Sequence, residues 1–152
     1  MRFLVGIDGS DASRKALDHA LDVADGTEAT LTLAYAVDPG VYAEGGEVPP
    51  ADLTDFDDRL VIENEDDAFE RGRQVVEAAA DHARGRAADG VDVDTALLDG
   101  DPVEALADFA AEQGYDGVFV GHRGLSAHEE RLLGSVAKSL VEGSSVPVTV
   151  VH

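Results

Sequence analysis

The chain has 152 residues, of which 11 are basic and 32 acidic, so its formal net charge is −21. This length fits one domain, and this charge repels nucleic-acid backbones and anionic membranes. The lack of cysteine excludes disulfides, thiolate catalysis and Cys-ligated metals. No apolar run is long enough to span a bilayer, and the short apolar start is typical of a buried strand, not of a signal peptide. We expect one cytoplasmic domain covering residues 1–152.

The acidic residues are spread over every segment, and this leaves two interpretations. One is a specialised acidic surface that binds a partner, and the other is adaptation to a cytoplasm of molar salt. The second is favoured because lysine occurs only at Lys15 and Lys138, and isoleucine only at Ile7 and Ile62. At about 1 M salt the Debye length is only ~3 Å, which screens such a surface. The composition predicts a halophilic archaeal protein that loses structure at low salt.

The first predicted elements are a strand, a helix and a second strand. Residues 3–7 form a short apolar run that ends in Asp8-Gly9-Ser10, a turn sequence. From Ser13 the apolar residues follow a helical spacing, and Gly26 lies beyond the last of them. Residues 30–37 are rich in strand formers and predict the second strand.

Residues 38–65 differ from the rest of the chain. They are rich in proline, glycine and acids and contain one base, Arg59. Connections of this length inside a compact domain are unusual, and are often functional or disordered. We expect an acidic, flexible insertion.

The second half continues the alternation of helices and strands. Asp101 is a good N-cap, Pro102 suits the first helical position, and Glu104 completes the pattern of a capping box. Pro147 cannot donate to a strand ladder, so the last strand is expected at a sheet edge. The predicted helices are 66–86, 102–113 and a last one that starts over 135–140 and stops at Gly143, and the predicted strands are 91–98, 117–121 and 146–151. Such alternation predicts an α/β domain whose parallel sheet has helices on both faces.

Sheets of this kind bind ligands beyond the carboxyl ends of their strands. Gly121 and Gly124 follow the fourth strand and allow backbone to approach a ligand, while Arg123 supplies a positive charge. Gly134 and Ser135 begin a helix, where exposed N–H groups attract phosphate. Together they form a plausible phosphate cradle, although a glycine pair of this spacing is by itself more often a turn.

Asp8 ends the first strand and has two interpretations. Its carboxylate suits a ribose hydroxyl or a Mg²⁺ ion near phosphates, or it forms an Asx turn that caps the next helix. Other signatures are absent, including the P-loop, the dinucleotide fingerprint and the nucleophile elbow. The histidines show no ligand spacing.

These residues resemble the universal stress protein family, in its nucleotide-binding type, over essentially the whole chain. The resemblance rests on Val5-Gly-Ile-Asp-Gly-Ser10, on Gly100-Asp-Pro102, and on the spacing Gly121-x2-Gly124-x9-Gly134-Ser135. The ending, Leu133 to Val136 followed by Val146-Pro-Val148, also fits the family.

The resemblance implies a single doubly wound, Rossmann-like parallel sheet of five strands in the order 3-2-1-4-5. It implies a homodimer through the last strand, 146–151, and ATP or AMP as ligand with Mg²⁺ or Mn²⁺. Asp8 would hold ribose or the metal, and the adenine site would be lined by Ile7, Ala36 and Val120. The ribose and phosphates would be bound by Gly121, Arg123, Gly124, Gly134, Ser135 and Val136.

Two features depart from the family pattern. His122 stands where the family commonly has a small hydroxyl residue. Glu129 and Glu130 lie between the glycines and would repel phosphates if they faced them, so we expect them to face solvent.

The leading hypothesis is an ATP-binding universal stress protein, a dimeric regulatory switch in the stress response with an unknown protein partner. No motif places a general base, so no catalytic residue is assigned and at most a slow ATPase is expected. The alternatives are an enzyme that uses adenine nucleotides, as a slow ATPase or by adenylyl transfer, and a nucleotide-free dimerisation module. The sequence does not decide between ATP, AMP and cyclic AMP.

Overall fold

The structure is a computed structural model that describes residues 1–38, 65–122 and 134–152. The predicted insertion after Asp38 and the loop after His122 therefore lie outside the described residues. The elements in chain order are β1 (Arg2–Gly6), α1 (Asp11–Ala24), β2 (Thr30–Val37), α5 (Glu65–Arg86), β3 (Asp92–Asp99), α6 (Pro102–Glu112), β4 (Gly117–Gly121), α7 (Ser135–Gly143) and β5 (Val148–Val151).

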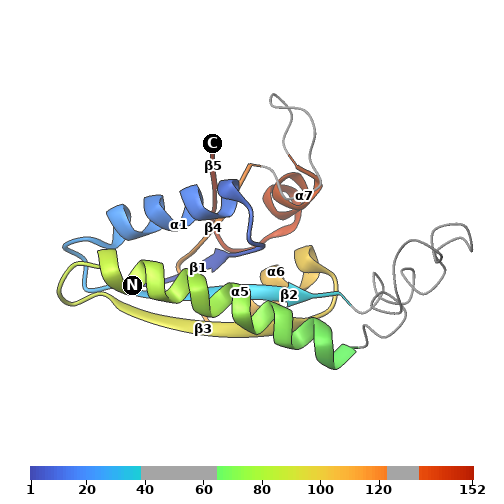
Figure 1. Cartoon of the computed structure of the whole chain (residues 1–152). Helices are drawn as coiled ribbons and strands as arrows, with labels where there is room; N and C mark the ends of the chain where they lie inside the picture. The colour runs from blue at the N-terminus through green and yellow to red at the C-terminus, as the bar shows by residue number, and fades with distance from the viewer. Residues whose placement is uncertain (39–64, 123–133) are drawn as a thin grey trace, which may run out of the picture.

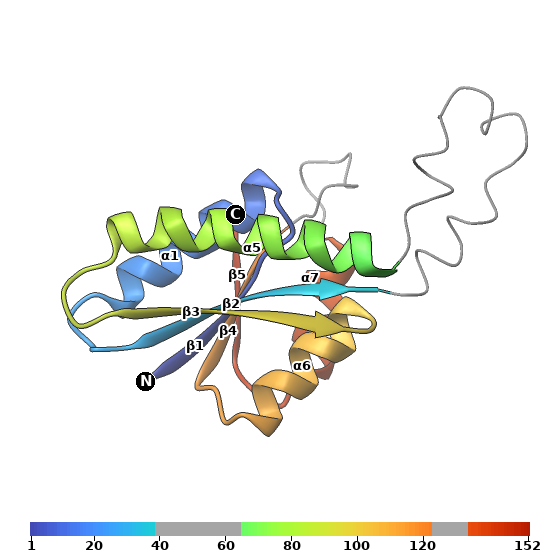
Figure 2. The same ribbon diagram turned by 60° about the horizontal axis from the view of Figure 1, so that its bottom comes forward.

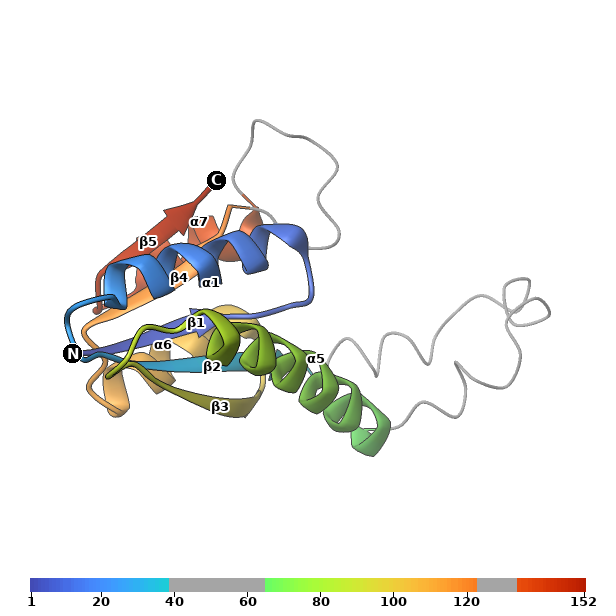
Figure 3. The same cartoon turned by 60° about the vertical axis from the view of Figure 1, so that its left-hand side comes forward.

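The strands form one five-stranded sheet in the order β3-β2-β1-β4-β5, and every neighbouring pair is parallel. This confirms both the predicted class and the predicted strand order. The first strand lies in the middle of the sheet, while β3 and β5 form its two edges (Figure 3). Because parallel strands need crossover connections, the helices are carried onto the faces of the sheet.

Two layers of helices cover the two faces of the sheet. Helices α1 and α5 pack on one face, and α6 and α7 pack on the other (Figures 1 and 2). The apolar strands contribute side chains to the cores on both faces, because successive side chains of a strand point to opposite sides of the sheet. In β1, Phe3 and Val5 join the α1/α5 core, whereas Leu4 joins the α6/α7 core. The Phe3 ring meets Phe119 edge to face at 5.3 Å.

The starts of two helices follow from their capping residues. Helix α1 begins at Asp11, two residues before the predicted start, because the Ser10 Oγ accepts a hydrogen bond from the Ser13 N–H at 3.1 Å. Helix α6 begins as predicted, with the Asp101 carboxylate accepting from the N–H groups of Val103 and Glu104 at 2.9 and 3.1 Å.

Strand β5 begins at Val148, two residues after the predicted start. The reason lies in Pro147, which has no N–H to give to the ladder. Its carbonyl still accepts a hydrogen bond from the Val118 N–H at 2.9 Å, so the chain already runs beside β4 before the strand begins.

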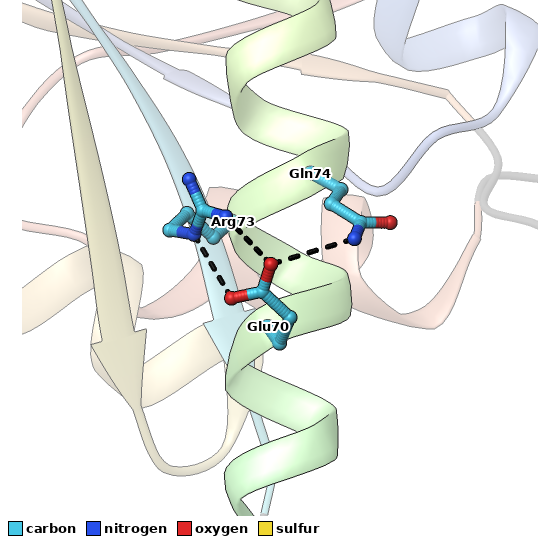
Figure 4. Close-up of polar contacts among 3 residues, drawn as sticks. All are labelled: Glu70, Arg73 and Gln74. Carbon is cyan, nitrogen blue, oxygen red and sulfur yellow. Dashed lines mark hydrogen bonds and ion pairs between the residues drawn. The ribbon is translucent and has the colours of Figure 1, made fainter.

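Polar contacts on α5 lie on its surface and along its contact with α1. Arg73 donates to both carboxylate oxygens of Glu70, one of which also accepts from Gln74 (Figure 4). Across the two helices, the Asp18 carboxylate lies 2.8 Å from His82 Nε2 and also pairs with Arg86. Among the described residues, no helix combines the length and the apolar character needed to cross a membrane.

Candidate ligand site at the carboxyl edge of the sheet

Strand register brings the predicted site residues to one edge of the sheet. Val5 is paired with Phe119, so Ile7 lies level with Gly121 when the register is continued by two residues. Gly6 is paired with Ala34, which in the same way places Asp8 level with Ala36. The ends of β1, β2 and β4 therefore meet at the carboxyl edge, as expected for ligand sites in this fold.

The side chains of Ile7 and Val120 point to opposite faces of the sheet. Ile7 is 6% exposed and belongs to the α1/α5 core, whereas Val120 is 5% exposed and belongs to the α6/α7 core. Ala36 alternates with Ala34, a member of the α6/α7 core, and is half-buried. A single apolar wall made by Ile7 and Val120 together is therefore not present, and their role in holding adenine stays a prediction.

The Asp8 carboxylate caps the turn between β1 and α1. Its Oδ1 accepts from the Ser10 N–H at 2.9 Å and also from the Ser10 hydroxyl. Ser10 in turn caps α1, and Gly9 between them has φ of +85°, which favours glycine. The Asx turn is thus observed. Asp8 remains half-buried at the sheet edge, and its predicted contact with a ribose or a metal stays a prediction.

Gly121 is required by packing against α1. A Cβ on this residue would lie 2.5 Å from the Ala12 carbonyl carbon and 2.7 Å from its Cβ and oxygen. Backbone atoms cannot retreat as a flexible side chain does, so only glycine fits here. The sequence suggested that Gly121 lets a ligand approach, and the structure shows that it lets the first turn of α1 approach.

The start of α7 is tied to the end of β4 by the backbone. The Gly134 N–H donates to the His122 carbonyl at 2.5 Å, and the His122 N–H donates to the Val151 carbonyl at 2.9 Å. Gly134 is the N-cap residue, and among the described residues no side chain caps this helix. Ser135 is exposed at the first helical position, while Val136 is half-buried against the α6/α7 core.

Charge at this helix start differs from the rest of the chain. The first turn of α7 contains no acidic residue, although 32 of the 152 residues are acidic. N–H groups that no described side chain caps, in a first turn without an acid, favour an anion. The structure thus brings Gly134 and Ser135 beside the end of β4, as the glycine spacing predicted.

Some predicted residues cannot be placed, and one structural residue was missed. Arg123 and Gly124 lie outside the described residues. Ser10 was predicted only as part of a turn, but its side chain caps α1. The available signal was a serine three residues before Ser13, the spacing at which an N-cap side chain accepts from a backbone N–H. Within residues 1–38, 65–122 and 134–152, no group of three or more His, Asp or Glu side chains is arranged to hold a metal.

The fold places this chain among the doubly wound α/β proteins whose ligands bind at the carboxyl edge of the sheet. The sequence profile of the Universal stress protein family matches residues 1–152. The chain is 31% identical to the universal stress protein YxiE of Bacillus subtilis over 154 aligned residues, which cover 99% of this chain and 98% of the relative. The protein belongs to the universal stress protein family.

Solved structures with the same fold include two that hold adenine nucleotides. One is a universal stress protein in complex with cAMP, 29% identical, with a TM-score of 0.67 over 100% of this chain and 97% of that one. The other is the universal stress protein of Archaeoglobus fulgidus in complex with dAMP, 18% identical, with a TM-score of 0.70 over 100% and 98%. The second likeness shows the fold alone.

Proposed function

We propose that this protein binds ATP at the carboxyl edge of its sheet and acts as a dimeric regulatory switch with little or no hydrolysis. The observation that carries the proposal is the start of α7, where no described side chain caps the helix and no acid lies in the first turn. Phosphate oxygens would accept hydrogen bonds from the first-turn N–H groups and from the Ser135 hydroxyl.

The adenosine part of the ligand would extend toward the ends of β1 and β2. Asp8 and Ala36 are level across these two strands, and both are half-buried. The relatives solved with cAMP and dAMP share an adenine base and a ribose-type sugar, and this supports adenosine as the common element. ATP is the finer assignment, because the acid-free helix start suits several phosphates.

A divalent cation fits this arrangement only as a partner of the nucleotide. Mg²⁺ usually keeps several waters and is held by phosphates plus one or two carboxylates. Asp8 is one carboxylate at this edge that would meet this need, and no cage of protein ligands occurs in the described residues. The cation would neutralise phosphate charge beside an otherwise acidic surface.

The dimer is proposed through β5 and the residues before it, 146–151. Among the described residues β5 pairs only with β4, so its other edge has backbone groups without a described strand partner. Val148 and Val150 are half-buried, and Val141 on α7 is 53% exposed, so apolar surface accompanies that edge. Pairing with a second copy would cover both across a two-fold axis.

The first test is nucleotide binding by calorimetry in molar KCl with Mg²⁺, using ATP, AMP and cAMP. Ser135→Ala removes the proposed phosphate donor and should weaken ATP binding about tenfold. Ser139→Ala is the matched control, because Ser139 is also exposed on α7 but one turn further on. Equal losses in both variants, or no ATP binding by the folded chain, would contradict the proposal.

Chromatography of the nucleotide after incubation tests the switch against an enzyme. Intact ATP after many binding lifetimes supports the switch, since none of the residues assigned to the site is a general base. Accumulation of ADP or AMP at about one turnover per second or faster would assign the protein to the enzymes instead.

A further inference from the structure

A second concave site lies between the two helices that cover the other face of the sheet. The groove has a volume of about 190 Å³ and is formed by the beginning of α1 and the middle of α5. These helices lie side by side over the same face (Figure 3). The start of α7 belongs to the opposite layer, so the groove is separate from the proposed phosphate site, and it shares only Ile7 with the residues predicted to line the adenine site.

The floor of the groove is apolar. Ile7 and Leu17 are 6% and 1% exposed, and Val75 and Ala79 are half-buried beside them. The space remains because Ala78 and Ala79 present only methyl groups toward α1. A cavity of about 150 Å³ is large enough to hold benzene, so this groove has room for one aromatic ring and a small substituent.

The side chains that line the groove differ in charge from the chain as a whole. None of its lining residues is acidic, and the two that carry or can gain charge are Arg14 and His82. Among the described residues, the Arg14 guanidinium makes no hydrogen bond or ion pair, whereas His82 is held by Asp18. The nearby Asp8 carboxylate, two residues beyond the end of β1, accepts hydrogen bonds from Ser10.

We propose that this groove binds a small aromatic carboxylate. The ring would lie on the apolar floor, and the carboxylate would pair with the Arg14 guanidinium, which has a fork of donors suited to it. The apolar floor alone would accept any small ring. Arg14 pairs with no described residue although the chain has a net charge of −21, so it favours a ligand that carries a negative charge. The proposal does not depend on nucleotide binding.

The test is a titration of the full chain with benzoate, followed by amide NMR in molar KCl. Saturable shifts are expected at Gly9, Ala78 and Ala79, which line the groove. Arg14→Gln should weaken binding about tenfold or more. Lys15→Gln is the matched control, because Lys15 is the next residue on α1, is exposed and lies outside the groove. It should change the affinity less than twofold.

Three further measurements distinguish binding in this groove from binding elsewhere on the protein. Benzyl alcohol, which has the ring without the charge, should bind about tenfold more weakly than benzoate. Ala78→Phe, at an exposed position, should fill the groove and abolish binding while the dispersed amide spectrum is kept. Ser135→Ala should bind benzoate as tightly as the unmodified chain, because it alters only the start of α7.

The proposal is overturned by any of four results. These are no saturable shifts up to roughly 20 mM benzoate, equal affinity in Arg14→Gln, equal affinity for benzyl alcohol, and unchanged binding in Ala78→Phe. The last result would place the bound benzoate at a different surface of the chain.

Discussion

The starts of α1 and α7 follow two neighbouring strands of the sheet, β1 and β4, and they differ in every capping feature. At α1, Ser10 caps the helix, Asp8 holds Ser10, and Asp11 adds negative charge to the first turn. At α7, the N-cap is Gly134, no described side chain caps the helix, and no acid lies in the first turn.

This difference separates structural stabilisation from ligand binding. At the start of α1 the Ser10 hydroxyl accepts from the Ser13 N–H, so the chain itself supplies an acceptor at that end. At the start of α7 no described side chain caps the helix and no acid lies in the first turn, so that end is suited to an anion. Two helix starts at one topological switch point thus have different roles, and five experiments test this division.

The largest expected effect concerns the salt that screens the whole surface. Lowering KCl from molar to millimolar should abolish the cooperative unfolding transition, because a net charge of −21 then repels itself across the compact state. Circular dichroism melts over a KCl series give the result. A melt that is the same at both salt levels would contradict the halophilic interpretation, and the comparison of helix starts could then be made in dilute buffer.

Converting the start of α7 into one like that of α1 is the sharpest test. The double substitution Gly134→Ser and Ser135→Asp reproduces the Ser10-Asp11 sequence and supplies both a cap and an acid. ATP affinity should fall about 100-fold, equivalent to ~2.7 kcal/mol, while stability stays the same or rises by up to about 1 kcal/mol.

The control for that double substitution is Ser139→Asp, which adds the same charge to α7 away from its first turn. It should change ATP affinity far less. If the two variants bind ATP equally well, the open helix start has no special role.

Gly121→Ala tests how closely the end of β4 must approach α1. The added Cβ would collide with the Ala12 backbone, so the free energy of unfolding should fall by about 1–3 kcal/mol. Gly85→Ala in α5 is the control, because nothing lies within 4 Å of its added Cβ. The control should be neutral or stabilising, and chemical denaturation of both variants measures the contrast. Equal effects would show that the contact with Ala12 is not limiting.

Removing the cap of α1 should cost stability and should change ATP binding much less than Ser135→Ala does, because the Asp8 carboxylate keeps its hydrogen bond from the Ser10 N–H. Ser10→Ala deletes the oxygen that accepts from the Ser13 N–H, and about 1 kcal/mol of stability is expected to be lost. Ser135→Ala should leave stability nearly unchanged and weaken ATP binding. A reversal of these outcomes, read by denaturation and calorimetry, would exchange the roles assigned to the two helix starts.

The smallest effect is expected from an ion pair far from both helix starts. Hydrogen bonds from Arg73 lower the pKa of Glu70, and Glu70 raises the pKa of Arg73. The lowered Glu70 pKa means that its contribution is present above the unfolded-state pKa and is lost as the pH falls through the folded-state value. Because the pair is exposed, Glu70→Gln should shift Tm at pH 7 by less than about 1 °C. A larger shift would mean that surface charge on α5 matters more than either helix start.

Local signals in the sequence predicted much of the fold and part of the site. The bounds 30–37 and 117–121 of two strands were predicted from strand formers alone, and Asp101 was recognised as a cap because capping depends on neighbouring residues. The glycine spacing also predicted that Gly134 lies near the end of β4, and the structure places it there.

Other features depend on how distant elements meet, and the sequence did not reveal them. The residues on both faces of β1 and β4 are apolar. The sequence therefore had no alternation of apolar and polar residues to indicate that Ile7 and Val120 point to opposite cores. The contact of Gly121 with Ala12 and the groove beside Arg14 arise from helix packing across the sheet. The spacing of residues along the chain does not predict contacts between elements that are distant in the sequence.

The central place of β1 in the sheet also has a consequence for synthesis on the ribosome. β1 ends at Gly6, but its second partner, β4, begins only at Gly117, about 110 residues later. At ~5–20 residues per second, one side of β1 waits roughly 5–20 s for its partner. During that time the nascent chain can complete β3-β2-β1 but presents an apolar strand edge open to incorrect pairing. The unfinished chain, more than the finished protein, is therefore the form most exposed to aggregation.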